Sequence, residues 1–454
     1  MSIIIIGAGE VGFNLAQRLS LEKKDVVVID RDPEKIRRVQ NTLDVQAIHG
    51  SGGSLSILRE AGISQASMVI AVTNSDEVNM ISCLVAGVQD KIPKKIARVR
   101  DPQYSSLFPL FDKEHLDIDL VINPDQEVVE EVLKLMEVPG AVEVVDFADG
   151  KVRMVGLPLL PGSPMAGKTL AEISRMYPHS GILIVAVQKG ERIFIPKGQD
   201  VIAANDLLFM VMARDKMREA LESSGHKRPA IKRVMILGGS LIGMELAEKL
   251  EERDMQVKII EQNEDRCQEI AEKCNRALVL RGDATYQDLL IEENVAEMDT
   301  FIAVTEDEET NVMISLLAKK MGARRVITLV NKVGYSLLVH SIGVDVVVSP
   351  RLAAVTKIMQ FLRRGKILSI SSLPGENAEA FEAVAMETSD LVGRPLREME
   401  FPKDAIVGAI VNSSGVVIPD GSAVIQPGDR VMIFALTSAI KEVEKTLMVK
   451  LEFW

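Results

Sequence analysis

Short runs of apolar residues alternate with longer amphipathic stretches in the first part of the chain. The apolar runs are Ile3–Ile6, Val26–Asp30, Gln46–Gly50, Met68–Thr73, Lys95–Arg100 and Leu120–Ile122. Successive apolar β-branched residues, as at Ile3–Ile6, are typical of a strand that is buried on both faces of a parallel sheet. Amphipathic stretches separate the runs, for example over Ser54–Gly62 and from about Asp76 to Gln89. This alternation predicts a doubly wound α/β domain over residues 1–139.

The same order returns in the second half of the chain. Val234–Leu237 repeats the first apolar run, and Val257–Glu261 repeats the second. The segment Ala71–Asn79 is echoed by Ala303–Asn311 at nearly the same offset. A constant offset between matching segments is the signature of internal repetition. We therefore predict a tandem duplication, with a second Rossmann-type domain over residues 232–366.

Each predicted sheet is followed by a smaller, strand-rich segment. In the first segment the apolar runs are Ala141–Phe147, Val152–Leu157, Ile182–Gln188, Arg192–Pro196 and Asp206–Met212. The segment after the second sheet repeats this order, with Gly393-Arg394 in the place of Gly167-Lys168. We predict small α/β domains over residues 140–218 and 367–454. The charged segment Arg214–Lys232 contains Gly and Pro, and we expect the linker between the halves over residues 219–231.

A glycine-rich turn follows the first strand and resembles a dinucleotide-binding loop. Residues 7–12 read G-A-G-E-V-G and fit the pattern G-x-G-x-x-G. In that pattern Gly7 allows a sharp turn, Gly9 lets a pyrophosphate approach the backbone, and Gly12 lets the helix lie close to the sheet. Asp30 ends the second strand, where an acid can accept hydrogen bonds from a ribose diol. The alternative is a glycine turn that only packs a helix on a sheet, but it leaves Asp30 unexplained.

Composition narrows the classes of function. The chain has 454 residues, which suggests three or four domains, and its net charge of -12 argues against a nucleic acid partner. No signal peptide and no membrane-spanning apolar run is evident, so we expect a soluble, cytoplasmic protein. Three cysteines without C-x-x-C pairing and five scattered histidines predict reduced thiols and no metal site.

Two Rossmann-type units that each precede a small α/β domain, with the matching segments Ala71–Asn79 and Ala303–Asn311, resemble RCK proteins, the regulators of potassium conductance. The resemblance covers the whole chain and includes Ser349-Pro350-Arg351 after the second sheet. It implies a nucleotide-sensing regulatory subunit, not an enzyme. Such subunits form a tetrameric ring on the cytoplasmic face of the membrane and gate an integral membrane potassium channel or transporter. It also implies that NAD(H), and ATP or ADP as well, act as gating ligands.

The resemblance assigns residues to a first cleft, residue by residue. These are Gly7, Ala8, Gly9, Glu10, Val11, Gly12, Asp30, Thr73, Asn74 and Arg98. The chemistry of the residues agrees, because Thr73 ends the fourth strand at the carboxyl edge where open α/β sheets bind ligands. Arg98 on the next strand can reach a phosphate, although a surface ion pair is the alternative for this side chain. Arg100 is the weaker candidate for that contact.

The matching second cleft departs from the dinucleotide pattern. Its residues are Gly238, Gly239, Ser240, Leu241, Ile242, Gly243, Glu261, Asp283 and Thr305. Ser240 replaces the middle glycine, and Leu329 stands where the first half has Arg98. We expect Ser240 to narrow the approach to the backbone and to meet a loop conformation that favours glycine. The second cleft is then either a weaker nucleotide site with its own preference or a degenerate, structural copy.

Two pairs of adjacent acidic residues occur at matching places in the two halves. Asp76-Glu77 and Asp307-Glu308 each begin a predicted helix, where carboxylates cap free N–H groups, so we favour capping over paired catalytic acids.

The alternative function is an NAD-dependent oxidoreductase. Against it, each sheet is followed by only a small domain, and no His, Lys or Tyr lies in a recognisable proton-transfer constellation. A nucleotide-sensing transcription factor would need a basic helix-turn-helix, which is missing from the sequence.

Overall fold

The fold is that of a computed structural model of the chain. It describes residues 2–90, 94–106, 108–178, 180–190, 192–226, 231–331, 339, 342–362, 367–372 and 378–447. The chain divides into two compact units, of which the first comprises Met1–Val128 with Ser349–Leu362 and the second comprises Val129–Val348 with Arg363–Trp454. No helix in this described part of the chain is long and apolar enough to cross a membrane. The three cysteines are free thiols, of which Cys83 and Cys274 are buried.

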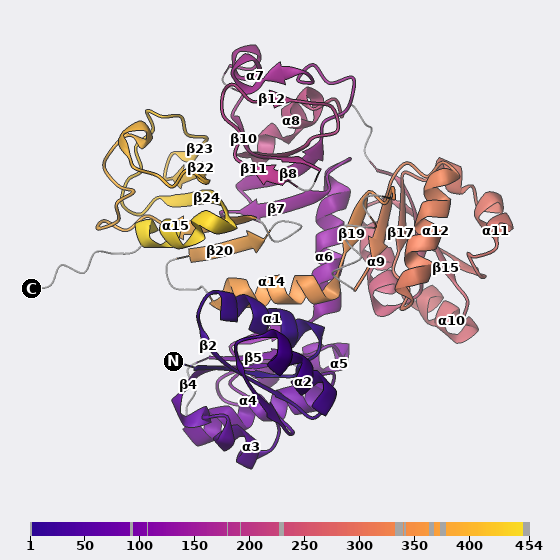
Figure 1. The fold of residues 1–454 in the computed structure, drawn as a ribbon. Coiled ribbons are helices and arrows are strands. Elements are labelled where there is room, and N and C mark those ends of the chain that lie inside the picture. Colours follow the sequence, from indigo (N-terminus) through magenta and orange to yellow (C-terminus); the bar gives the residue numbers. More distant parts are fainter. Residues whose placement is uncertain are drawn as a thin grey trace, which may run out of the picture. The chain divides into compact units, whose positions relative to one another are not determined.

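The first unit contains a six-stranded parallel sheet in the order β3-β2-β1-β4-β5-β6 (Figure 1). Its strands are β1 (Ser2–Ile6), β2 (Asp25–Asp30), β3 (Gln46–His49), β4 (Ala66–Ala71), β5 (Lys95–Arg98) and β6 (Leu120–Ile122). All four isoleucines of Ile3–Ile6 are buried, as the apolar run predicts. The strand order reverses between β1 and β4, and such a reversal opens a crevice at the carboxyl ends of the strands.

The helices of this unit follow the predicted alternation. They are α1 (Glu10–Leu21), α2 (Pro33–Thr42), α3 (Leu55–Glu60), η1 (Ile63–Gln65), α4 (Asp76–Asp90), α5 (Pro102–Ser106) and η2 (Phe108–Phe111). Helix α2 is the longest of the helices that the amphipathic pattern did not predict. It begins with Pro33 in its first turn, and the Asp32 carboxylate accepts a hydrogen bond from Glu34 N at 2.9 Å. This start signal is present in the sequence, but polar residues dominate the helix and hide its periodicity.

The second unit contains the matching six-stranded parallel sheet, in the order β16-β15-β14-β17-β18-β19. Its strands are β14 (Arg233–Leu237), β15 (Gln256–Glu261), β16 (Leu278–Arg281), β17 (Thr300–Ala303), β18 (Val326–Leu329) and β19 (Val346–Val348). Its helices are α9 (Leu241–Glu252), α10 (Glu264–Lys273), α11 (Gln287–Glu292), η4 (Val295–Glu297) and α12 (Glu308–Lys320). The same strand order in both sheets agrees with the predicted duplication.

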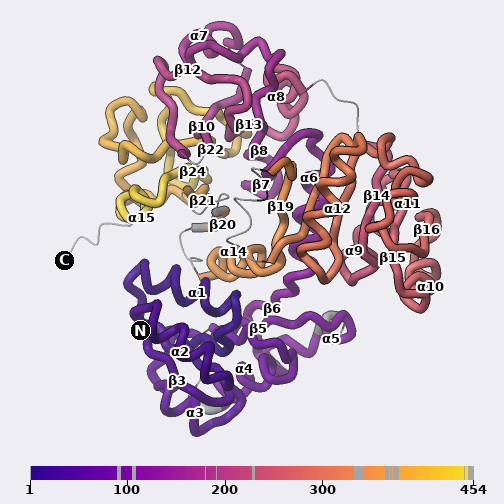
Figure 2. The backbone as a smooth tube through the Cα atoms, turned by 45° about the vertical axis from the view of Figure 1, so that its right-hand side comes forward, coloured from indigo at the N-terminus to yellow at the C-terminus, as the bar shows by residue number. Residues whose placement is uncertain are grey.

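The helix after each sheet does not stay with that sheet. Helix α14 (Pro350–Leu362) follows β19 in the chain but packs on α1 in the first unit (Figure 2), where Val355 and Ile358 share one core with Leu15. Helix α6 (Pro124–Glu137) follows β6, but from Val129 onward it belongs to the second unit. There the buried guanidinium of Arg325 donates to Leu135 O at 3.0 Å. The predicted segments 1–139 and 232–366 therefore each include a helix that packs elsewhere.

The two small domains are five-stranded antiparallel sheets, both in the second unit. The first has the order β11-β10-β13-β8-β7, and its elements are β7 (Glu143–Phe147), β8 (Val152–Pro158), β9 (Lys168–Thr169), α7 (Leu170–Met176), β10 (Ile182–Lys189), β11 (Arg192–Phe194), β12 (Val201–Ile202), β13 (Leu207–Ala213), η3 (Arg214–Lys216) and α8 (Met217–Ser223). Helix α8 occupies the first part of the predicted linker 219–231, and residues 227–230 lie outside the described residues.

The second small domain has the sheet order β20-β21-β24-β22-β23. Its elements are β20 (Ile367–Ser372), β21 (Ala378–Val384), η5 (Leu396–Glu398), β22 (Ala405–Asn412), β23 (Gly415–Val417), β24 (Arg430–Leu436), η6 (Thr437–Ala439) and α15 (Ile440–Leu447). The two small sheets share one apolar core, in which Phe147 and Phe209 of the first meet Phe434 of the second. The buried Glu382 carboxylate also accepts from Ala148 N at 3.0 Å. The small domains thus pair within one chain.

Candidate functional site

The first glycine loop has the geometry that a pyrophosphate requires. Gly7 has a φ of 107°, in the left-handed region that favours glycine. A Cβ on Gly12 would lie 1.8 Å from Gly7 O, so only glycine allows the helix to come this close. A Cβ on Gly9 would meet no atom within 4 Å, and Gly9 caps α1 without a side-chain hydrogen bond. The space beside Gly9 at the start of α1 is therefore open, and this is the place where such loops hold phosphate.

The first-turn residues of α1 contribute backbone groups rather than side chains. Val11 is buried in the core, and the Glu10 carboxylate pairs with Arg38 at 2.7 Å. In the second loop the Leu241 side chain is exposed, and Ile242 is buried. None of these four side chains needs to touch a ligand, because phosphate binding at a helix start uses N–H groups.

Asp30 joins the glycine loop to the end of β2. Its Oδ2 accepts from Ala8 N at 2.6 Å, and its Oδ1 accepts from Asp32 N at 2.8 Å. Each carboxylate oxygen has a second lone pair, so the side chain is held in place and can still accept from two ribose hydroxyls. The sequence predicted the acid at this position, and the structure adds that two backbone N–H groups orient it.

Glu261 plays the same part in the second loop with a longer side chain. Its Oε2 accepts from Gly239 N at 2.7 Å, and its Oε1 accepts from Gln262 N and Asn263 N, both at 2.8 Å. The second loop also repeats the turn and the close helix approach, since Gly238 has a φ of 103° and a Cβ on Gly243 would lie 2.0 Å from Gly238 O.

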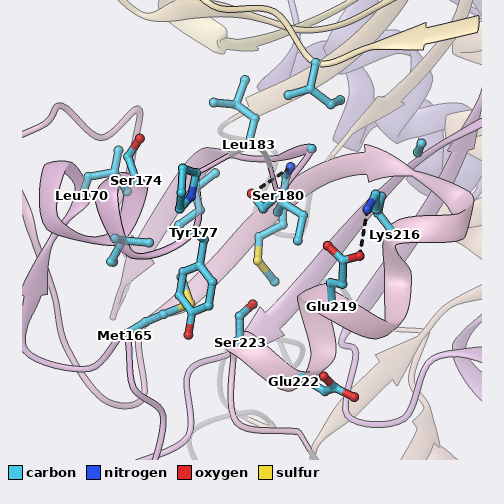
Figure 3. Close-up of a pocket in the computed structure, with 18 of the residues that line it drawn as sticks. Met165, Leu170, Ser174, Tyr177, Ser180, Leu183, Lys216, Glu219, Glu222 and Ser223 are labelled. Carbon is cyan, nitrogen blue, oxygen red and sulfur yellow. Dashed lines mark hydrogen bonds and ion pairs between the residues drawn. The ribbon is translucent and has the colours of Figure 1, made fainter.

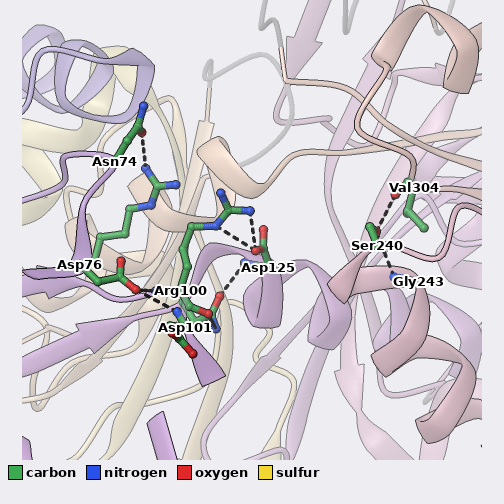
Figure 4. A network of polar contacts seen from close by, with 10 residues as sticks. Asn74, Asp76, Arg100, Asp101, Asp125, Ser240, Gly243 and Val304 are labelled. Carbon is green, nitrogen blue, oxygen red and sulfur yellow. Dashed lines mark hydrogen bonds and ion pairs between the residues drawn. The ribbon is translucent and has the colours of Figure 1, made fainter. Parts of the chain in front are cut away.

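Our prediction that Ser240 meets a loop conformation favouring glycine is wrong. The Ser240 φ of -57° is close to the -65° of Gly9, and any residue can adopt it, so the serine is not strained. Its hydroxyl instead caps α9 (Figure 4), because Oγ accepts from Gly243 N at 3.3 Å and donates to Val304 O at 2.8 Å. The side chain thus takes the N–H group of Gly243, whereas no described side chain takes the matching N–H group of Gly12 at the start of α1. The predicted narrowing of the approach to the loop backbone therefore comes from the Ser240 hydroxyl, and the backbone torsion angles do not contribute to it.

A buried asparagine holds the threonine at the edge of each cleft. Asn79 Oδ1 accepts from Thr73 N at 2.9 Å and from Thr73 Oγ1 at 2.8 Å, while its Nδ2 donates to Thr73 O at 3.1 Å. Asn311 makes the same three bonds to Thr305, at 2.9, 2.7 and 3.0 Å. Both asparagines are fully buried. The sequence pattern assigned them no role, although the repeated segment contains both.

Arg98 lies next to Asn74 at the carboxyl end of β5. Its Nη1 donates to Asn74 Oδ1 at 3.3 Å, and among the described residues its buried Nε has no hydrogen-bond partner. Burial, followed by the repulsion of Arg100, lowers the pKa of the Arg98 guanidinium. Arg98 as a whole is half-buried, but because a buried donor without a partner is costly, the site favours an acceptor, such as an anion, beside its Nε. Leu329 has the matching place in the second half, where its backbone O accepts from Asn311.

Arg100 is engaged in a different pair. Its Nε and Nη2 donate to Asp125 Oδ2 at 3.0 and 2.7 Å, as Figure 4 shows. Asp76 Oδ2 accepts from Arg100 N and Asp101 N, both at 2.9 Å. The prediction that Asp76 caps its own helix is therefore wrong, since this carboxylate instead fixes the loop after β5. The difference arises because a long-range N–H group competes with the local ones.

The two carboxylates of the second acidic pair have different roles, one as a helix cap and one as a long-range acceptor. Asp307 is the N-cap residue of α12 and accepts from Glu309 N at 3.2 Å, so the capping prediction is confirmed there. Glu308 accepts from Asn331 N at 2.8 Å, which matches the contact of Asp76 in the first half. The carboxylates of Asp76, Asp307 and Glu308 thus have structural hydrogen-bond partners.

The second cleft encloses about 560 Å³ between the ends of its strands. Besides the predicted residues, Arg266 of α10 lines it and donates to Gly239 O. Asp283 also lines the cleft, and its Oδ1 accepts from Thr285 N and Oγ1 at 2.8 and 2.7 Å. The sequence did not point to Arg266, because this cation comes from the helix after β15 and not from the strand that carries Leu329.

Comparison with known proteins identifies the domains. Residues 3–124 and 234–350 match the TrkA-N domain, and residues 154–225 and 380–448 match the TrkA-C domain. The chain is 39% identical over 461 residues to the Trk system potassium uptake protein TrkA of Azorhizobium caulinodans, which covers 100% of both chains. It is also 39% identical over 458 residues to the TrkA protein of Halomonas elongata, again over 100% of both.

Solved structures agree on the fold. The GsuK RCK domain superposes with a TM-score of 0.62 at 20% identity, covering 98% of this chain and 94% of that one. The GsuK channel bound to NAD gives a TM-score of 0.62 at 19% identity and covers 98% of this chain and 78% of that one. The predicted fold class, two Rossmann-type RCK domains that each precede a small α/β domain, is confirmed. The chain belongs to the TrkA family of Trk system potassium uptake proteins.

Proposed function

We propose that the first cleft binds NAD(H) and that the chain is a nucleotide-sensing regulatory subunit. The observation that carries this proposal is the buried Arg98 Nε, which has no hydrogen-bond partner among the residues that the structure describes, together with the open space above Gly9. Asp30 offers acceptors to a ribose diol, and the N–H groups at the start of α1 offer donors to a pyrophosphate. The chain's own residues therefore fit both ends of a dinucleotide. The name of the GsuK channel structure bound to NAD supports the same ligand.

Asp30 favours NAD(H) over NADP(H) in this proposal. Its carboxylate accepts from the ribose hydroxyls and repels a 2′-phosphate. Arg31 follows directly and is the one feature that would accommodate that phosphate. Titration calorimetry with both cofactors on the full chain tests the preference, and equal or tighter binding of NADPH would contradict it.

ATP or ADP are further ligands of the first cleft, since they share the ribose and phosphate groups. The second cleft keeps the ribose acceptor Glu261 but has the Ser240 hydroxyl at the helix start and Leu329 in place of Arg98. We therefore propose a weaker dinucleotide site there, in which Arg266 supplies the cation. Competition between NADH and ADP for the full chain, followed by calorimetry, distinguishes a shared site from separate ones.

The ligand-dependent step is a rearrangement of the domains that is passed to a membrane partner. That partner is an integral membrane potassium channel or transporter subunit of the TrkH type, and the chain acts at the cytoplasmic face of the membrane. The names of the TrkA relatives and of the GsuK channel support this role. Nucleotide shifts the conformational equilibrium only by its difference in affinity between the two states. Co-purification from membranes with mass spectrometry tests the partner, and recovery of the chain without any integral membrane protein would count against it.

The proposed assembly is a homotetrameric ring without nucleic acid or metal. Light scattering of the purified chain tests it, and a mass near the 49.8 kDa of one chain would contradict it. The alternative of an NAD-dependent oxidoreductase predicts consumption of NADH. Incubation with NADH and a panel of carbonyl compounds should leave the nicotinamide absorbance unchanged, whereas turnover would overturn the regulatory proposal.

A further inference from the structure

A groove of about 1020 Å³ lies in the first small domain, away from both glycine loops. Helices α7 and α8 form its sides, strands β10 and β13 form its floor, and Val416 and Ile418 of the second small domain complete it. Figure 3 shows the ring of Tyr177 in the middle of the groove, with Met165 to one side and the pair Lys216–Glu219 to the other. The volume is at the upper end of the range of about 300–1,000 Å³ that is typical of ligand sites.

The floor of the groove is apolar. Met165, Ile173, Ile184 and Met210 line it, and each of these side chains is buried. Tyr177 is half-buried and adds an aromatic face. Methionine side chains adapt to different shapes, and an aromatic face attracts cations. The floor thus suits the apolar part of a small organic molecule.

In the second small domain, Leu396, Met399 and Ile440 pack against the apolar core. The inward residues of α15 are Val443 and Leu447, both buried.

Helix α8, the counterpart of α15 in the first small domain, has smaller inward residues. It turns Ala220 inward, and Ser224 follows at its end, where α15 has the larger Val443 and Leu447. Both small residues are completely buried, and neither of them lines the groove. Helix α8 contributes Glu219, Glu222 and Ser223 to the lining.

The rim of the groove is acidic. Among the described lining residues, it carries the carboxylates of Asp215, Glu219 and Glu222 and one cation, Lys216. Lys216 Nζ pairs with Glu219 Oε1 at 2.8 Å. Among the residues that the structure describes, Asp215 and Glu222 form no ion pair with a basic side chain. The rim is thus negatively charged, and it disfavours phosphates and other anions while it attracts cations.

We infer that this groove binds a small organic ammonium ion with an apolar or aromatic body. The apolar part would lie on Met165, Ile173 and the Tyr177 ring, and the ammonium group would lie at the rim near Asp215 and Glu222. This site does not depend on the proposed nucleotide function, because no residue of the glycine loops or of the strand-end acids lines it. The opposite charge preference also separates its ligand from nucleotides.

Methionine-methyl NMR of the full chain tests this inference directly. The probe is 2-phenylethylamine, and the matched anion is 3-phenylpropanoate, which has a similar apolar body. We expect the amine to shift the Met165 and Met210 methyl signals in a saturable manner, and the carboxylate to leave them in place at the same concentrations. Assignment comes from Met165→Leu and Met210→Leu spectra. No saturable shift with the amine, or equal shifts with both compounds, would overturn the inference.

Substitutions at the rim separate charge attraction from mere apolar binding. The double change Asp215→Asn with Glu222→Gln should weaken binding of 2-phenylethylamine by roughly 3- to 10-fold, the scale of exposed charge pairs. Both side chains are exposed, so the fold should be unaffected. Glu442→Gln on α15 is the matched control for an exposed acid in the second copy and should leave binding unchanged. Ser223→Trp should abolish binding by filling the groove. Unchanged affinity in the rim variant, or an equal loss in the Glu442 variant, would contradict the assignment.

Discussion

Gly239→Ala should destabilise the second glycine loop, although alanine occupies the matching place in the first. A Cβ on Gly239 would lie 2.6 Å from Ile270 Cδ1 and 2.9 Å from Glu261 Oε2, both inside the range that forces neighbours to move. Gly239 is outside the left-handed region, so the effect is steric only. The Glu261 carboxylate cannot retreat freely, because three backbone N–H groups hold it.

The first loop shows how the same position accepts a Cβ. Ala8 is buried there, and its neighbours are the shorter side chains of Asp30 and Val39, which stand where Glu261 and Ile270 stand in the second half. Overpacking of this kind costs about 1–3 kcal/mol. For a unit of this size, with an unfolding entropy of about 2.1 cal/mol/K per residue, that corresponds to a fall of roughly 1.5–5 °C in the thermal midpoint.

A rescue experiment tests the reasoning. Thermal unfolding of the full chain is measured for Gly239→Ala alone and for Gly239→Ala combined with Glu261→Asp and Ile270→Val. The two shortened side chains recreate the surroundings of Ala8, so the alanine should cost much less in that background. Ala8→Gly is the control and should change the midpoint only slightly. An equal cost of Gly239→Ala in both backgrounds would refute the steric account.

The remaining predictions concern ligand binding and pH. Arg98→Leu should weaken NADH binding by roughly 10- to 150-fold in calorimetry, the value of one charge-assisted hydrogen bond; an unchanged affinity would remove Arg98 from the site. Ser240→Gly should tighten binding at the second cleft, because it frees the capped N–H group, and it should lower stability by only a few tenths of a kcal/mol. Burial, and then repulsion by Glu131, raises the pKa of Glu143 from 4.5 to about 8. Stability from this group is lost as pH rises from 4.5 to 8, so Glu143→Gln should raise the thermal midpoint at pH 9 and leave it unchanged at pH 4.

Local chemistry made much of the first cleft predictable. The spacing from Gly7 to Asp30 predicted the turn, the helix and the acid at the end of β2, because all of them lie within one βαβ unit. The role of Asn79 was not predictable in the same way, since its four hydrogen bonds include one to the next strand, at Arg98 O. Ser240 shows the opposite error. The middle glycine of the pattern suggested that this position needs torsion angles that favour glycine, but Ser240 has a φ that any residue can adopt.

Long-range packing set the limit of prediction. The sequence did not predict where α14 packs, because the chain order places it directly after β19 and only long-range contacts bring it to α1. The exchange of α6 and α14 has a practical consequence, because cutting the chain in the segment Arg214–Lys232 would separate α14 from the core that it completes. The two clefts are therefore better compared by substitutions in the full chain. The groove beside Tyr177 was also not predictable, since its lining residues come from segments far apart in the sequence that only the fold brings together.

The most direct test of the central claim is NADH calorimetry on the full chain with Gly9→Ala. The new methyl group would enter space that holds no protein atom within 4 Å, so the thermal midpoint should remain nearly unchanged. In the bound state, however, the methyl group would occupy the path of the pyrophosphate. We therefore predict a loss of affinity of at least about tenfold, equivalent to about 1.4 kcal/mol, without a loss of stability. Unchanged NADH affinity in a stable Gly9→Ala chain would contradict the assignment of the first cleft as the dinucleotide site.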